Sequence, residues 1–256
     1  MKRVLIIAAA PFGWLDRSAI EVANSIASDH DADDVITVGA VELAAGSWSH
    51  RVVHGEPSPT VRLKDGTLID SDDFGAVLNL VRSLPVTGFA RASHHDRAHA
   101  EQQALFVSFL CSFRCRVINS VDGQGPRGLR SPTRWTALAQ RCGIDTPSDG
   151  VATGTRVLTQ RAMSSSFVGA NVSASAPIGV TVVGERVFGA VSPMHARQCR
   201  RLARAAGCEL LGLQFSDGPQ RQLLAADPFP SLSGQVAAAV ARLLCERAVA
   251  AGERAA

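Results

Sequence analysis

Lysine is almost missing from this sequence. Of its 256 residues only Lys2 and Lys64 are lysines, so the formal net charge of +3 rests almost wholly on arginine. Arginine stays charged and its planar fork matches carboxylates and phosphates, which is compatible with an anionic ligand, although solvated surface arginines are the simpler explanation. Aromatic residues make up 5% of the chain and interleave with no basic block, so a nucleic-acid partner is not expected.

Paired cysteines and long apolar runs are missing too. The six cysteines form no CxxC pair, which argues against a zinc ribbon, and they lie in apolar segments, as expected of buried thiols in a reducing compartment. The apolar residues 4–10 (VLIIAAA) are better explained as a buried first strand than as a signal peptide. No run approaches the roughly 20 apolar residues of a membrane span. These absences predict a cytoplasmic protein with no membrane partner.

Two common enzyme signatures do not occur. The sequence has no GxSxG nucleophile elbow, and residues 8–13 (AAAPFG) lack the glycines of a dinucleotide-binding turn. The densest group of metal-capable side chains is His94, His95, Asp96, His99 and Glu101. His95 and His99 are four residues apart and share a helix face, but no distant third ligand is evident. The sequence therefore leaves metal binding by this pair open.

The first part of the chain alternates strands and helices. Residues 3–10 are typical of a buried strand, 18–27 of a helix and 35–38 of a second strand, an order that predicts a parallel sheet. Residues 47–59 are polar and show no strong period. The alternating segment 61–69 turns at Asp65-Gly66, which predicts a hairpin. A buried strand, a long helix, a short strand and a second helix follow at 74–80, 93–113, 117–118 and 133–142.

The composition changes after the helix at 133–142. Residues 163–177 are rich in Ser, Ala and Gly and predict a mobile loop. The later elements predict a separate antiparallel sheet with two helices. Its strands are expected at 179–183, 187–191, 209–215 and 222–226, and the helices at 194–206 and 234–250.

Several short stretches carry a resemblance through their order. Residues 63–80 contain a "dG..i" hairpin followed by a strand. Residues 117–120 (VINS) and 141–147 (RCGIDTP) are similar to "vlNsp" and "aGi..P". Residues 182–188 (VVGERVF) and 223–230 (LLAADPFP) are similar to "vvGdrvfaa" and "flEvNpfP". In this order the stretches resemble the ATP-grasp superfamily, especially the branch that modifies peptides and ribosomal proteins.

The resemblance implies a fold and a chemistry. It implies an α/β chain with a parallel, Rossmann-like pre-ATP-grasp domain at residues 1–90, followed by a reduced α+β ATP-grasp-like domain with an antiparallel sheet at 91–256. Such ligases use ATP and Mg to activate a carboxylate as an acyl-phosphate, which an amine then attacks. The substrate would be a peptide or a small carboxylic acid, and a homodimer or a partner enzyme is compatible with this reading.

The departures from the family pattern are specific. The family holds phosphates with lysines, yet none follows Lys64, and only about thirty residues are available where a central subdomain usually folds. The "EvN" metal ligands fall on Ala225 and Asp227, and the aspartate of the preceding strand falls on Gln214. A magnesium ion would have Asp227, with Asp217 as its one candidate helper. We therefore expect weak or absent ATP binding.

Two functions stay open on this sequence. One is a compact carboxylate-amine ligase, and the other is a degenerate ATP-grasp protein that binds a peptide or partner subunit without catalysis. The candidate catalytic residues are Arg134, Arg186 and Asp227, the candidate cofactor-binding residues are Asn119 and Arg161, and Asp227 is the candidate metal ligand. Arg130 and Arg156 are further candidate cations. We expect a cleft between the two halves, lined by Asn119 and Arg134 from one side and by Arg161, Arg186 and Asp227 from the other. Surface roles for the arginines and a plain turn at Asp227 are equally compatible.

Overall fold

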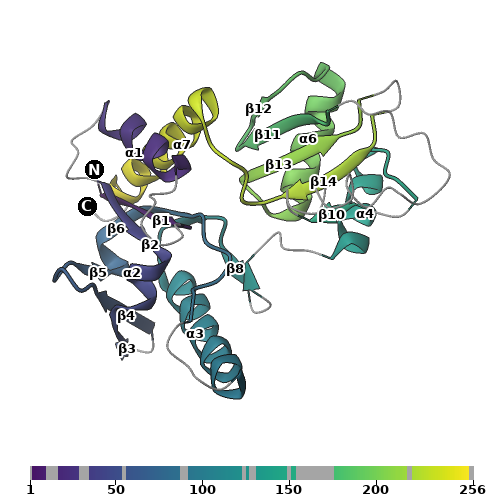
Figure 1. Cartoon of the computed structure of the whole chain (residues 1–256). Helices are drawn as coiled ribbons and strands as arrows, with labels where there is room; N and C mark the ends of the chain where they lie inside the picture. Colours follow the sequence, from purple (N-terminus) through teal and green to yellow (C-terminus); the bar gives the residue numbers. More distant parts are fainter. Residues whose placement is uncertain are drawn as a thin grey trace. The chain divides into compact units, whose positions relative to one another are not determined.

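The computed structural model describes residues 2–9, 17–28, 35–53, 56–86, 92–122, 125–126, 131–148, 151–153, 176–217 and 221–253 (Figure 1). The chain forms two compact units. The first comprises Met1–Pro126 together with Ser231–Ala256, and the second comprises Arg127–Pro230. Each unit has its own hydrophobic core.

A parallel sheet forms the centre of the first unit. In sheet order β2-β1-β6-β7, its strands are Val35–Gly39, Arg3–Ala8, Phe74–Asn79 and Arg116–Ile118. All neighbouring pairs are parallel. β1 and β6 are almost continuous apolar runs, as expected of parallel strands buried on both faces. The predicted parallel sheet at the N-terminus is confirmed.

Helices lie on both sides of this sheet (Figure 1). They are α1 (Arg17–Ala27), α2 (Ala40–Ala44), α3 (Ala92–Ser112) and α7 (Gly234–Glu253). Leu5 and Ile7 of β1 share a core cluster with Phe106 and Phe109 of α3. α7 instead passes over β6 at Gly75, where an added Cβ would lie 2.8 Å from the backbone of α7. Gly75 thus permits a close approach that any side chain would block.

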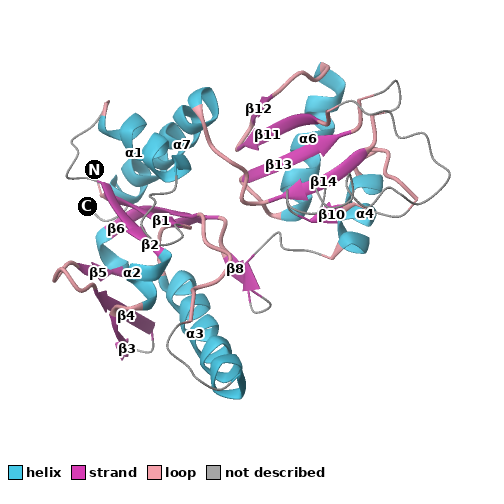
Figure 2. Ribbon diagram, in the orientation of Figure 1, coloured by secondary structure: helices cyan, strands magenta, loops and turns pink. Residues whose placement is uncertain are grey.

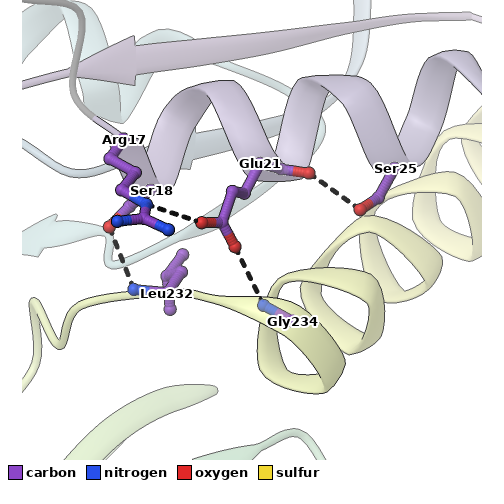
Figure 3. A network of polar contacts seen from close by, with 6 residues as sticks. All are labelled: Arg17, Ser18, Glu21, Ser25, Leu232 and Gly234. Carbon is purple, nitrogen blue, oxygen red and sulfur yellow. Dashed lines mark hydrogen bonds and ion pairs between the residues drawn. The ribbon is translucent and has the colours of Figure 1, made fainter.

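Figure 3 shows how α1 holds the start of α7. The Glu21 carboxylate accepts a hydrogen bond from the Gly234 N–H at 2.8 Å and another from the Arg17 guanidinium at 3.0 Å. The Ser18 hydroxyl accepts one from the Leu232 N–H at 2.9 Å. The first N–H groups of a helix have no partner within the helix, so α1 supplies partners for this end of α7.

A smaller antiparallel sheet adjoins the helices of the first unit. Its strands β3, β4 and β5 span Ser47–Val53, Glu56–Arg62 and Leu68–Asp70, and a 3₁₀ turn follows at Ser71–Asp73. The β4–β5 turn places Gly66 at φ 91°, and the Asp65 carboxylate accepts a hydrogen bond from the Thr67 N–H at 2.9 Å. The predicted hairpin is confirmed. A short pair, β8 (Val121–Asp122) and β9 (Gly125–Pro126), ends the first stretch of this unit.

The second unit contains the later, mainly antiparallel sheet. In sheet order β10-β14-β13-β11-β12, its strands are Ala152–Thr153, Leu223–Asp227, Leu210–Phe215, Ile178–Val183 and Arg186–Phe188. Only the β10–β14 pair is parallel. The predicted separate antiparallel sheet is confirmed, and Figure 2 shows its strands in front of helix α6.

The helices of the second unit pack on one face of its sheet. They are α4 (Pro132–Arg141) and α6 (Pro193–Ala206), and each begins with a serine N-cap followed by proline. Val182 and Leu213 point to this face and share a core cluster with Trp135 of α4 and Leu202 of α6. Gly207 ends α6 in the left-handed conformation at φ 68°.

The boundaries of the two units differ from those of the expected domains, 1–90 and 91–256. β7 continues the first sheet by pairing with β6, and α7 returns to pack on the same sheet, so both belong to the first unit. Most of the loop predicted at 163–177 lies outside the described residues. Among the described helices, none combines the length and the apolar character needed to cross a membrane.

Candidate functional site

Strand pairing in the second unit brings three expected metal-ligand positions together. Gln214 of β13 lies opposite Ala225 of β14, and Gly212 lies opposite Asp227. Paired residues, and residues two apart on one strand, point to the same face of a sheet. Gln214, Ala225 and Asp227 therefore share the face opposite the helices, which we call the Asp227 face. It offers one carboxylate and one amide where the resemblance implied three acidic or amide ligands.

Asp227 is held by a tight local turn. Its side chain is buried, and its Oδ1 accepts a hydrogen bond from the Phe229 N–H at 2.9 Å. The chain then folds back so that a Cβ placed on Gly212 would lie 2.8 Å from the Pro230 Cβ. The segment 227–230 is thus a rigid turn against its own strand pair. This geometry fixes the direction of the carboxylate and gives Asp227 a structural role in the turn.

The described residues supply few ligands for a magnesium ion. No group of three His, Cys, Asp or Glu side chains among them is arranged to hold a metal ion. Magnesium commonly uses only one or two protein carboxylates and takes its other ligands from phosphate oxygens and water. Asp227, with the Gln214 amide oxygen as its neighbour on the sheet, fits an ion that arrives with a nucleotide. These two residues do not fit an ion held by the protein alone.

Arg186 shares the Asp227 face but lies at its far edge. It begins β12 opposite Val183, which in turn lies opposite Leu210. Three strand spacings separate β12 from β14, which places the two backbones roughly 15 Å apart. The Arg186 side chain is exposed. Arg186 and Asp227 therefore cannot hold the same small group, although they face the same way.

Arg134 lies elsewhere in the second unit. It is exposed in the first turn of α4, and its N–H donates to the hydroxyl of the N-cap Ser131 at 3.3 Å. α4 packs through Trp135 on the face of the sheet that points away from Asp227. The structure does not bring Arg134 and Asp227 to one face of this sheet. The reason is that α4 packs on the other face of the sheet, and the motif comparison does not specify on which face a helix packs.

Asn119 belongs to the first unit and forms a reciprocal pair with Asn79. The Asn79 side-chain amide donates to the Asn119 carbonyl at 3.2 Å, and the Asn119 amide donates to the Asn79 carbonyl at 3.0 Å. Asn119 adopts φ 58° and is buried, and its Oδ1 has no hydrogen-bond partner among the described residues. The pair joins the carboxyl ends of β6 and β7, the edge at which open parallel sheets bind ligands.

Asn79 was not among the residues singled out from the sequence. Its signal is a buried amide at the end of the otherwise apolar strand 74–79. A fully buried polar side chain needs hydrogen-bond partners, so such a position points to a specific contact even when the partner is unknown. Arg161, Arg130 and Arg156 lie outside the described residues.

The histidine pair on α3 is a stack without a third ligand in the described part of the chain. The His95 and His99 rings are nearly parallel, with centroids 6.4 Å apart. His95 Nδ1 lies 3.7 Å from a carboxylate oxygen of Asp96. Both contacts join neighbours in the first turns of α3, so the pair supplies at most two imidazole ligands, fewer than the three or four protein ligands of a zinc site.

Solved structures resemble the whole chain. The Chryseobacterium gregarium RiPP-associated ATP-grasp ligase, in complex with ADP and a leader and core peptide, has a TM-score of 0.70 at 14% identity and covers 97% of this chain and 98% of its own. The chain has the ATP-grasp fold. The resemblance drawn from the ordered motifs is thereby confirmed at the level of fold.

Two further ATP-grasp structures agree. The macrocyclase MdnC from Microcystis aeruginosa, bound to precursor peptide MdnA, has a TM-score of 0.72 at 11% identity and covers 95% of this chain and 99% of its own. The ligase PsnB, complexed with a phosphomimetic variant of its minimal precursor, Mg and ADP, has a TM-score of 0.67 at 14% identity and covers 96% of this chain and 99% of its own. No family model matches this sequence, and no curated protein matches it.

Proposed function

We propose that this ATP-grasp protein acts in a peptide-modification pathway as a carboxylate-amine ligase, with ATP and magnesium bound on the Asp227 face. The observation that carries the proposal is that Gln214, Ala225 and Asp227 lie on one face of a sheet. The chain that contains this sheet resembles ATP-grasp ligases solved with bound peptides. Solved structures of this fold carry ADP and Mg. The missing lysines led us to expect weak or absent nucleotide binding, and the buried, oriented carboxylate is the reason to propose binding instead.

The residues of the Asp227 face would have different roles in binding. Asp227 would hold the magnesium ion that accompanies the nucleotide phosphates, with the Gln214 amide oxygen beside it. Arg186, at the other edge of the same face, would hold an anionic group at the far end of an extended ligand, such as a substrate carboxylate. Bound ATP would supply the phosphoryl group that activates a carboxylate. The protein's own contribution would be positioning and charge stabilisation.

Substitution of Asp227 tests where the nucleotide binds. Asp227→Asn keeps the size of the side chain and an acceptor for the Phe229 N–H but removes the charge that magnesium needs. We expect it to weaken ATP binding at least about tenfold in the presence of magnesium, roughly 1.4 kcal/mol, and to leave binding in EDTA unchanged. Asp145→Asn, an exposed acid elsewhere in the second unit, is the matched control and should change neither value. Equal effects of the two substitutions would remove Asp227 from the site.

A peptide-binding protein without catalysis is the second candidate. Ala225 stands where the resemblance places a glutamate, and Gln214 stands where it places an aspartate. Both replacements remove negative charge that would otherwise hold magnesium. The two candidates differ in one measurable property, because only the ligase requires ATP together with magnesium.

A further inference from the structure

One helix of the second unit has an unusually uniform charge. α6 carries four arginines and no acidic residue. Its inward residues Cys199, Leu202, Ala203 and Ala206 are buried in the core cluster. Arg197, Arg200, Arg201 and Arg204 recur at the spacing i, i+3, i+4, i+7, which places them together on the opposite side of the helix. We call these four residues the α6 arginine stripe.

Among the described residues, only one end of the stripe has a carboxylate partner. Glu185, in the turn between β11 and β12, pairs with Arg204 through both of its carboxylate oxygens, and its carbonyl accepts a hydrogen bond from Arg200 at 3.3 Å. Among the residues that the structure describes, no carboxylate lies within ion-pair distance of Arg197 or Arg201. The Glu185–Arg204 pair therefore shows the stripe engaging a carboxylate, while its other end has no such partner in the described part of the chain.

A fifth arginine extends the positive region. Arg141 ends α4 and is exposed, and the Gln198 amide of α6 donates to the carbonyl of Gly143, two residues beyond Arg141. Burial raises the pKa of the Cys142 thiol, and the charges of Arg201 and Arg141 both oppose that rise. The Gln198–Gly143 hydrogen bond and the packing of α4 on α6 bring the end of α4, with Arg141, beside the stripe. Arg141 likewise has no ion-pair partner within the described part of the chain.

We infer that the α6 arginine stripe, with Arg141 beside it, is a docking surface for a carboxylate-rich polypeptide segment. Neighbouring arginines of the stripe are about 5–6 Å apart at their Cβ atoms. Carboxylates on alternate residues of an extended peptide recur at about 6.6–6.8 Å, so successive side chains can each meet one arginine. The forked geometry of the Glu185–Arg204 contact is the pairing that a bound glutamate or aspartate would repeat. The surface does not depend on nucleotide binding, so it stands apart from the proposed ligase activity.

A peptide fits this surface better than a nucleic acid does. Proteins that bind single strands combine a basic groove with aromatic side chains on which bases stack. The outward face of α6 has no aromatic residue. The stripe also spans only eight residues of helix, about 10 Å from the first to the last Cα, which is short for a phosphate-tracking groove.

Fluorescence anisotropy with a fluorescein-labelled peptide of ten glutamates tests the inference on the full chain. The double variant Arg197→Glu/Arg201→Glu should weaken binding at least about tenfold, because attraction becomes repulsion at two contacts. The matched control Arg51→Glu/Arg62→Glu makes the same charge change at exposed positions of the first unit and should shift binding less than about twofold. Arg197→Gln/Arg201→Gln, which adds no repulsion, should give a smaller loss in the same direction.

Three results would overturn the assignment of this surface. The first is an equal loss of affinity in the stripe variant and in the control variant, which would indicate a general charge effect. The second is binding of a ten-glutamine peptide as tight as that of the glutamate peptide. The third is a single-stranded ten-nucleotide DNA that competes better than the glutamate peptide, which would indicate a nucleic-acid site. Circular dichroism of each variant confirms that the comparison is made between folded proteins.

Discussion

Glu21 in α1 and Gly234 at the start of α7 are 213 residues apart in the sequence and joined by a hydrogen bond of 2.8 Å. The bond gives the first N–H of α7 a partner and ties the returning chain to the first unit (Figure 3). Negative charge is favourable at a helix N-terminus, so the carboxylate serves both as acceptor and as a charge. This contact makes the stability of the first unit depend on pH.

Neutralising Glu21 should destabilise the protein above the ordinary pKa of the carboxyl and not in strong acid. The Gly234 N–H, followed by Arg17, holds the pKa of Glu21 below its ordinary value of 4.5 in the folded state. The stabilising contribution is therefore full above that ordinary value and is lost as the pH falls through the folded-state pKa. We expect Glu21→Gln to lower the Tm by about 2–4 °C at neutral pH. The difference from the natural protein should shrink as the pH falls below 4.5 and through the lowered folded-state pKa of Glu21.

Calorimetric melting across this pH range measures the effect. Glu246→Gln, at an exposed position of α7, is the matched control and should leave the Tm unchanged at every pH. A Tm difference for Glu21→Gln that persists undiminished in acid would show that the charge of Glu21 does not carry the contact.

A side chain at Gly212 should strain the turn that holds Asp227. Its Cβ would lie 2.8 Å from the Pro230 Cβ, closer than carbon atoms pack. We expect Gly212→Ala to cost about 1–3 kcal/mol of stability, because the turn must move to accommodate the methyl group. Gly179→Ala on the neighbouring strand β11 is the control, since nothing lies within 4 Å of its added Cβ. Chemical denaturation of both variants decides the point, and equal stabilities would contradict the close packing.

The Asn79–Asn119 pair should act as one unit. Asn119→Gly keeps a residue that tolerates φ 58° but removes the amide that donates to Asn79. We expect it to cost about 1–3 kcal/mol, because the buried Asn79 carbonyl loses its donor. Asn119→Ala should cost more, because alanine is also strained at this φ. In a double-mutant cycle, Asn79→Ala and Asn119→Gly should be strongly non-additive, and additive free energies would exclude direct coupling.

The local sequence pattern was sufficient to predict elements with a strong signal of their own, such as a continuous apolar strand or a turn that contains glycine. The apolar run of β1 and the Asp65-Gly66 turn both predicted what the structure shows. The strands β3 and β4 were not predicted at 47–59, because that segment is polar and shows no strong period, and Pro57 and Pro59 are also unusual inside a strand. In the structure these prolines lie on the part of β4 that pairs only with β3, since β5 reaches only residues 60–62. Their missing N–H groups are therefore tolerated at a free edge.

In the candidate site, too, some features could be predicted from the sequence and others required the tertiary structure. The positions of Gln214, Ala225 and Asp227 followed from motif spacing, because neighbouring antiparallel strands fix which residues lie opposite one another. The side of the sheet on which Arg134 lies depends on how α4 packs through Trp135, which no local pattern encodes. The Asn79–Asn119 contact joins residues 40 apart and likewise required the tertiary structure.

Calorimetric titration of the natural protein with ATP in magnesium chloride tests the central proposal most directly. A ligase that uses the Asp227 face should bind with a dissociation constant of about 10 μM or tighter, roughly 7 kcal/mol of binding free energy. That affinity should fall when EDTA replaces magnesium, since the ion would join the nucleotide phosphates to Asp227. The absence of binding heat up to about 1 mM ATP, where binding is worth only about 4 kcal/mol, would contradict the ligase and leave the peptide-binding protein without catalysis.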